Sequence, residues 1–309
     1  MTLPRPAAGY DDRGMPSVPT LATGPLAAES PGTVRVVSPA ELAARIGEVD
    51  VLDARDANPF RRGHVPGAAQ VDWRDWAEQR PGLLGKALGD PSRWGRVASG
   101  PGVEERLRRL GLSATRETVL VGDPSGWGEE GRLAWSLLYW GAGRVALLDG
   151  GFPAWRDDPD RLVEAGGARP RTDGDFAVRL RPERRVETAA LGEIVSRADE
   201  GLVLDARTPE EYGGARRYRE RRGGHSPGAH LVPARSLYRP DGGYVDAEEL
   251  RRLLPAGASA PVAYCTGGVR SALLAVLLEA RLGLRARNYD GSMWEWAADA
   301  RLPLESGDR

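Results

Sequence analysis

Short runs of apolar residues alternate with longer amphipathic stretches in the C-terminal half of this chain. The pattern predicts buried strands and helices in alternation, with strands over residues 202–204, 262–264 and 286–289 and helices over residues 189–198, 247–254 and 271–282. Such an alternation is typical of an α/β fold, in which a parallel sheet is flanked by helices. Ligands of parallel sheets bind at the carboxyl ends of the strands. Cys265 follows the strand 262–264 directly, so it lies where function is expected.

The chain also contains a long internal repeat. Three motifs occur twice and in the same order: Asp-Ala-Arg at 53–55 and 205–207, Gly-His-x-Pro-Gly-Ala at 63–68 and 224–229, and an Asp-Gly turn at 149–151 and 290–292. Two copies of one domain are the simplest account of this order.

The repeat sets the expected domain boundaries. A Pro/Ala/Gly-rich segment, residues 1–33, is expected to be a disordered tail. The first α/β domain is expected over residues 34–156 and the second over residues 186–306. Residues 157–185 form the linker between them, which is expected to wrap the first domain.

Composition narrows the classes of partner and compartment. The 309 residues carry 43 Lys and Arg against 44 Asp and Glu, so no overall field favours nucleic acid or a membrane surface. No stretch approaches the roughly 20 apolar residues that span a bilayer, and no apolar segment of a secretory signal is present near the start. One cysteine forms no intramolecular disulfide, and with three histidines it argues against a Cys/His zinc site. A cytoplasmic protein without a metal or organic cofactor is predicted.

The loop after Cys265 has the composition of an anion cradle. Cys265 is followed by Thr266, Gly267, Gly268, Val269 and Arg270, and then by the helix-forming segment. Backbone N–H groups at a helix N-terminus stabilise negative charge, and Arg270 adds a positive charge. A thiol in such a setting has a lowered pKa, which makes Cys265 a candidate nucleophile. The alternative is a small, inert core cysteine.

The first copy differs at the equivalent loop. Its strand ends at Asp123, where the second copy has the cysteine, and no arginine follows until Arg132. A carboxylate does not accept sulfur as a thiolate does, so the first domain is expected to be chemically silent. Its expected role is to pack on the second domain and to form one wall of the cleft.

Together these motifs resemble those of the tandem-domain rhodaneses, sulfurtransferases with an inactive first domain and a cysteine in the second. The resemblance covers nearly everything from Val34 to Leu304. It implies two rhodanese-like domains and transfer of a sulfane sulfur from a small donor to Cys265. The resulting persulfide would pass the sulfur to a thiophilic acceptor such as cyanide or a cellular thiol.

Two other functions stay open on the sequence. A cysteine-dependent phosphatase also combines a nucleophilic cysteine, an arginine and a helix N-terminus, but only four residues separate Cys265 from Arg270, one fewer than in that class. A non-catalytic sulfur carrier would be supported by a Cys265 that is buried and unreactive to alkylation.

The donor is predicted from residues around the second repeat's loops. Glu211 occupies a position where enzymes that use 3-mercaptopyruvate carry an arginine, which favours thiosulfate or a related donor, with 3-mercaptopyruvate as the alternative. Arg207, Arg216 and Arg217 are possible substrate-binding residues. The repeated Asp205–Arg207 pair and the repeated His64 and His225 are otherwise expected to be structural, through an ion pair and through hydrogen bonds to backbone groups.

Overall fold

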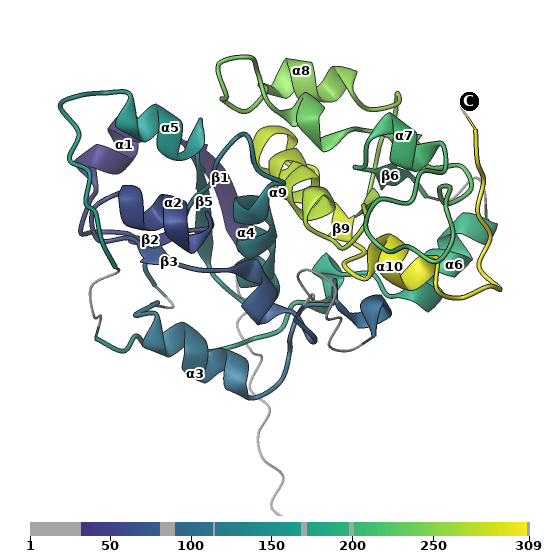
Figure 1. The fold of residues 1–309 in the computed structure, drawn as a ribbon, viewed down its shortest axis with the longest axis horizontal. Helices are drawn as coiled ribbons and strands as arrows, with labels where there is room; N and C mark the ends of the chain where they lie inside the picture. Colours follow the sequence, from purple (N-terminus) through teal and green to yellow (C-terminus); the bar gives the residue numbers. More distant parts are fainter. Residues whose placement is uncertain (1–31, 81–89, 114, 168–171, 198–200, 308–309) are drawn as a thin grey trace, which may run out of the picture. The chain divides into compact units, whose positions relative to one another are not determined.

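The computed structural model describes residues 32–80, 90–113, 115–167, 172–197 and 201–307 (Figure 1). The predicted tail, residues 1–33, therefore lies outside the described residues except at its end, where Thr33 already belongs to a strand. No helix within the described ranges is both long and apolar enough to span a bilayer.

The first sheet is parallel throughout and has the strand order β1-β5-β4-β2-β3. Its strands are β1 (Thr33–Val37), β2 (Asp50–Asp53), β3 (Ala69–Gln70), β4 (Thr118–Val121) and β5 (Arg144–Leu148). The helices of this half are α1 (Pro39–Ala44), α2 (Ala57–Arg62), α3 (Gly102–Arg109), α4 (Glu129–Tyr139) and α5 (Gly151–Arg156), with short 3-10 turns η1 (Trp73–Trp76) and η2 (Pro91–Arg93). All four residues of β2 and of β4 are buried, as expected for central strands that are covered on both faces.

The second sheet is also parallel and has the order β7-β6-β8-β9. Its strands are β6 (Val203–Asp205), β7 (His230–Leu231), β8 (Val262–Tyr264) and β9 (Arg287–Asn288). The helices are α6 (Thr188–Ser196), α7 (Pro209–Tyr212), α8 (Ala247–Arg252), α9 (Arg270–Leu282) and α10 (Ser292–Trp296), with 3-10 turns η3 (Pro182–Arg184) and η4 (Ala234–Leu237). The predicted α/β fold with two parallel sheets is confirmed. No bounds were predicted for the two-residue strand β7, because so short a segment has no apolar period.

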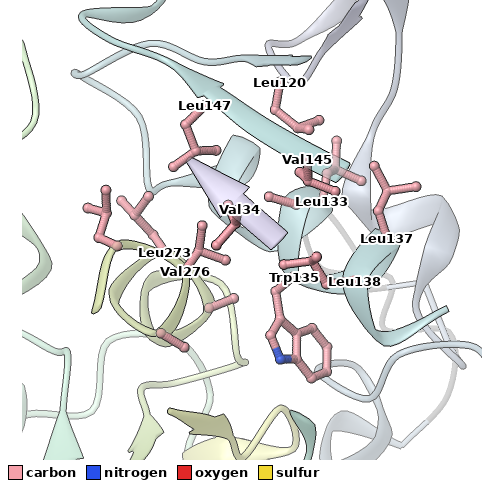
Figure 2. Packing of buried hydrophobic residues seen from close by; sticks show 14 of the residues in the cluster. Val34, Leu120, Leu133, Trp135, Leu137, Leu138, Val145, Leu147, Leu273 and Val276 are labelled. Atoms are coloured by element: carbon pink, nitrogen blue, oxygen red, sulfur yellow. The ribbon is translucent and has the colours of Figure 1, made fainter. Parts of the chain in front are cut away.

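The longest helices of the two halves, α4 and α9, pack against each other. Figure 2 shows Leu133, Trp135, Leu137 and Leu138 of α4 in one apolar cluster with Leu273 and Val276 of α9. The approach is close at Gly131, where an added Cβ would lie 2.4 Å from Cα of Leu273. Because each helix directly follows the loop at the end of a strand, their packing brings the corresponding loops of the two repeats together.

The described part of the predicted linker contacts the first half. The N–H of Phe176 donates to the carbonyl of Leu112 at 3.2 Å, and the N–H of Arg179 donates to the carbonyl of Trp140 at 2.8 Å. Phe176 itself is buried in the core. The exact residues at which one domain ends and the next begins stay predictions.

The repeated motifs adopt the same structure twice. Arg207 pairs with Asp205 at 2.6 Å and donates to the carbonyl of Gly224 at 2.8 Å, while Arg55 makes the same contacts with Asp53 and Gly63. Nδ1 of His225 lies 2.9 Å from the carbonyl of Tyr212, and Nδ1 of His64 lies 3.0 Å from that of Phe60. The structural roles expected for these repeated residues are confirmed.

Candidate active site

The loop from Cys265 to Arg270 connects the end of β8 to the first residue of α9. Gly268 has φ +75°, a conformation that favours glycine, and it lets the chain turn into the helix. Gly267 lies against the ring of Trp294, where an added Cβ would be 2.2 Å from the ring. The carbonyls of Cys265 and Thr266 accept the N–H groups of Met293 and Trp294 at 3.1 and 2.9 Å. The loop is therefore held between its own helix and the start of α10.

The sulfur of Cys265 is surrounded by hydrogen-bond donors. Burial acts most strongly and raises the pKa of the thiol, but the charge of Arg270, the N–H and hydroxyl of Ser271 and the N–H of Gly267 together bring the pKa below its usual value. The hydroxyl of Ser271 lies 3.6 Å from the sulfur. The N–H of Cys265 donates to Ser292 Oγ at 3.1 Å, which is how the repeated Asp-Gly turn supports the site. This setting favours the thiolate, the nucleophilic form.

Arg270 is paired with Glu211 in a buried, bidentate contact. Its two terminal nitrogens lie 2.7 and 2.8 Å from the carboxylate oxygens, and Thr266 Oγ1 donates to the same carboxylate at 2.8 Å. Burial opposes ionisation of Glu211, but Arg270 and the other donors lower the pKa of the carboxyl to about 2. The predicted preference for thiosulfate was based on the negative charge of Glu211. In the structure Arg270 neutralises that charge.

Arg132 of α4, in the first repeat, donates a hydrogen bond to the Cys265–Arg270 loop. Arg132 is 1% exposed, and it donates to the carbonyls of Gly268 at 3.2 Å and of Gly95 at 2.6 Å. Burial lowers the pKa of Arg132 to about 10, so the side chain stays charged at neutral pH. Its positive charge interacts with Cys265. The carbonyl of Gly268 also accepts from the Asn288 amide at 3.2 Å. The loop is thus fixed by residues of both repeats.

Cys265 borders a cavity of about 190 Å³, which we call the sulfur cavity. Cys265 itself is only 1% exposed. Both repeats line it: Trp73, Arg74, Trp127 and Glu129 from the first, and Tyr218, Cys265, Thr266, Gly267, Val269, Arg270 and Trp294 from the second. The first repeat supplies one wall, as predicted from the sequence.

The structure brings some of the predicted site residues together and leaves others apart. The six residues from Cys265 to Arg270 form the loop. Arg207 lies in its ion pair with Asp205 and borders a neighbouring cavity instead. Arg216 and Arg217 are exposed and are not among the residues that line the sulfur cavity.

Sequence reasoning missed several residues that contact the loop. Ser271, Asn288 and Ser292 lie beyond the predicted cradle, while Arg132 comes from the first repeat. Ser271 carried a signal, since it follows Arg270 in the first turn of the predicted helix; the others are brought in only by tertiary packing. Among the residues described, no group of three or more His, Cys, Asp or Glu side chains is placed to hold a metal ion.

Comparison with known proteins gives consistent matches along the chain. The family described as Rhodanese-like domain matches residues 38–158 and again residues 190–299. A thiosulfate sulfurtransferase of Corynebacterium glutamicum is 29% identical over 287 residues, which cover 89% of this chain and 91% of that protein. The sulfur carrier protein TtuD of Thermus thermophilus is 30% identical over 284 residues, with 85% and 91% covered.

A solved structure has the same fold. SseA from Escherichia coli, described as a 3-mercaptopyruvate sulfotransferase, superposes with a TM-score of 0.63 at 24% identity, covering 84% of this chain and 99% of its own. Both halves of the chain match the family separately, and relatives match over nearly their whole length. The chain therefore belongs to the rhodanese family and carries two copies of its domain.

Proposed function

We propose that this sulfurtransferase takes a sulfane sulfur from thiosulfate, or a related donor, onto Cys265 and passes it to a thiophilic acceptor. The observation that carries the proposal is the setting of the sulfur atom. A lone thiol lies at the carboxyl end of a parallel strand, beside a cavity, with its pKa lowered by Arg270 and by N–H and O–H donors despite its burial.

The proposed reaction has two steps. In the first, the thiolate of Cys265 attacks the outer sulfur of thiosulfate, the sulfur–sulfur bond breaks, and sulfite leaves with the electron pair. In the second, an acceptor such as cyanide attacks the outer sulfur of the persulfide, which gives thiocyanate and returns the thiolate. The donors around the sulfur stabilise the anion in both forms, so neither step needs a general base.

The donor preference rests on the charges around the sulfur cavity. Both terminal nitrogens of Arg270 already donate to Glu211, so Arg270 is not free to form a bidentate contact with the carboxylate of 3-mercaptopyruvate. Arg74 reaches the cavity from the first repeat, where it is paired with Asp72 at 2.7 Å and Asp56 at 2.6 Å. A compact donor that needs no such contact is favoured, and the Corynebacterium relative is named for thiosulfate. A role for Arg207, Arg216 and Arg217 in attracting an anionic donor stays a prediction.

A second function, as a sulfur carrier, is favoured by two observations. Cys265 is 1% exposed, and a relative with 30% identity is named a sulfur carrier protein. The two functions differ in turnover, because a carrier holds the persulfide until a partner protein receives it. For either function we place the reaction in the cytoplasm, where reducing conditions keep a lone thiol free.

Steady-state turnover separates these possibilities. Purified protein is supplied with cyanide and either thiosulfate or 3-mercaptopyruvate, and thiocyanate is measured for the wild type and for Cys265→Ala. We expect turnover with thiosulfate that exceeds turnover with 3-mercaptopyruvate and is lost in the variant. Faster turnover with 3-mercaptopyruvate would reverse the donor preference. Absence of turnover on either donor would favour the carrier, and phosphatase activity that depends on Cys265 would reject both.

A further inference from the structure

A second cavity lies next to the sulfur cavity and shares two of its walls. It has a volume of about 290 Å³ and is bordered by Trp127 and Arg270, which also border the sulfur cavity. We call it the adjoining cavity. Its size is close to the lower limit of small-molecule sites, roughly 300 Å³. Thiosulfate and cyanide are small ions that the sulfur cavity alone can hold, so the proposed reaction with them leaves the adjoining cavity unused.

The adjoining cavity is mainly apolar. Pro209, Pro233 and Ala234 of the second repeat line it, together with Trp127 of the first repeat. Trp127 is 51% exposed, although indole rings are normally more buried. An exposed aromatic ring at the entrance of an apolar cavity offers a stacking surface for a flat or apolar group.

Among the arginines that border the adjoining cavity, Arg235 is exposed to solvent. Arg207 and Arg270 border it, but both are buried and paired with Asp205 and Glu211. Arg235 of η4 is exposed; it donates to the carbonyl of Pro124 and lies 6.0 Å from the ring centroid of Tyr238. No carboxylate of the described residues forms an ion pair with Arg235. A ligand in this cavity would therefore be stabilised by an anionic group at the Arg235 end.

We propose that the adjoining cavity binds the body of the sulfur acceptor, and that this acceptor is a low-molecular-weight thiol with an aromatic or other apolar body and a carboxylate. The body packs on Trp127, the carboxylate pairs with Arg235, and the thiolate reaches into the sulfur cavity. There it attacks the outer sulfur of the Cys265 persulfide. The sulfur–sulfur bond breaks, its electron pair returns to the Cys265 thiolate, and the acceptor leaves as a persulfide. This inference rests on the proposed function.

The test compares acceptors that differ in one feature at a time. Thiosulfate is the donor throughout, and released sulfite is the readout for every acceptor. The probes are 4-(mercaptomethyl)benzoate, its uncharged analogue 4-(mercaptomethyl)benzyl alcohol, 2-mercaptoethanol and cyanide. Each kcat/KM is corrected for the thiolate fraction of the probe and divided by the value for cyanide with the same enzyme. The enzymes are the wild type, Trp127→Ala, Arg235→Gln and the control Arg252→Gln, an exposed arginine of α8 paired with Glu248.

We expect the wild type to prefer both aromatic thiols over 2-mercaptoethanol by about tenfold, and Trp127→Ala to remove most of this preference, as loss of an aromatic contact of about 1 kcal/mol would. Arg235→Gln should lower the ratio for the benzoate by about threefold and leave that for the alcohol unchanged, since an exposed ion pair contributes less than about 1 kcal/mol. Arg252→Gln should change neither ratio.

Equal use of all three thiols, with normal release of sulfite to cyanide, would overturn the proposed role of the adjoining cavity alone. Absence of sulfite release to cyanide in the wild type would overturn the proposed function and this inference with it.

Discussion

At the scale of single residues, the sulfur of Cys265 is governed by opposing effects. Burial raises the pKa of the thiol, while Arg270, Ser271 and the N–H of Gly267 lower it by a larger combined amount. The pairing of Arg270 with Glu211 limits its contribution, because the neighbouring carboxylate offsets part of the positive charge. The local donors therefore matter more than the sequence suggested, and Ser271 provides two of them.

Replacing Ser271 by Ala tests the role of its hydroxyl. The hydroxyl lies 3.6 Å from the sulfur, and its removal should favour the protonated thiol and shift the apparent pKa upward. At pH values below the midpoint, the rate of alkylation by iodoacetamide should fall by about fivefold, which corresponds to a hydrogen bond of about 1 kcal/mol. The measurement is alkylation rate against pH. Ser196→Ala, an exposed serine of α6, is the control. An unchanged midpoint in Ser271→Ala would contradict this role.

The sequence identified the loop residue by residue but not its supports. Cys265 to Arg270 are contiguous, so their composition alone indicated a cradle. Arg132 lies far from the loop in the sequence, and only the packing of α4 on α9 places its guanidinium under Gly268. Glu211 was interpreted as a charge facing the donor, because no local pattern shows that Arg270 turns toward it.

At the scale of elements, apolar runs predicted most of the second sheet. The helix expected over residues 271–282 is α9, Arg270–Leu282, and the strand expected over residues 262–264 is β8, Val262–Tyr264. Long buried segments carry a clear signal. The short strand β7 and the 3-10 turns do not, because they are fixed by hydrogen bonds to neighbouring segments rather than by periodicity.

Substitution of the two glycines that flank α9 distinguishes the effect of backbone strain from that of loop geometry. Gly268 and Gly283 have φ values of +75° and +65°, so alanine is strained at both positions, by about 1 kcal/mol. At Gly283 an added Cβ meets nothing within 4 Å, whereas at Gly268 it would lie 2.5 Å from the Asp290 carbonyl and 2.7 Å from Arg132.

Gly268→Ala should therefore lower both stability and turnover, whereas Gly283→Ala should lower only stability. We expect kcat with thiosulfate and cyanide to fall at least about tenfold in Gly268→Ala, which corresponds to about 1.4 kcal/mol in the barrier. Chemical denaturation and steady-state kinetics on both variants provide the comparison. Equal kinetic effects of the two substitutions would show that the shape of the loop is not what limits turnover.

At the scale of the whole molecule, the repeated Asp-Gly turns connect the two halves reciprocally. Oδ1 of Asp149 in the first repeat accepts the N–H of Tyr244 in the second at 2.7 Å, and Oδ2 of Asp290 in the second accepts the N–H of Val97 in the first, also at 2.7 Å. The repetition was visible in the sequence, but its role across the repeats was not. These contacts give the Asp-Gly turn of the first repeat a role in joining the two repeats.

The interface also holds a buried carboxyl group. Glu130 of α4 is 1% exposed, and its Oε1 accepts hydrogen bonds from the hydroxyls of Tyr238 and Tyr244, each at 2.9 Å. Its Oε2 has no partner among the described residues. Burial, with a further contribution from Glu129, raises the pKa of Glu130 to about 7. The folded protein therefore holds this proton more tightly than the unfolded chain does.

Stability should therefore fall as pH rises from about 4.5 to about 7 and show no further loss from this group above that range. The contribution of Glu130 over this range is about 3 kcal/mol. Glu130→Gln should remove this part of the pH dependence, which is measured as the free energy of unfolding in urea at a series of pH values. Glu248→Gln, on the exposed face of α8, is the control. Parallel curves for the wild type and Glu130→Gln would show that Glu130 is ionised alike in both states.

The central claim is that sulfur passes through a persulfide on Cys265, and the mass of the intact protein tests it most directly. The protein is incubated with thiosulfate and separated from excess donor, and its intact mass is measured by mass spectrometry. The mass is measured again after addition of cyanide. We predict a gain of one sulfur atom that disappears with cyanide as one equivalent of thiocyanate forms. Cys265→Ser should show no gain. An unchanged mass in the wild type, or an equal gain in Cys265→Ser, would contradict the account.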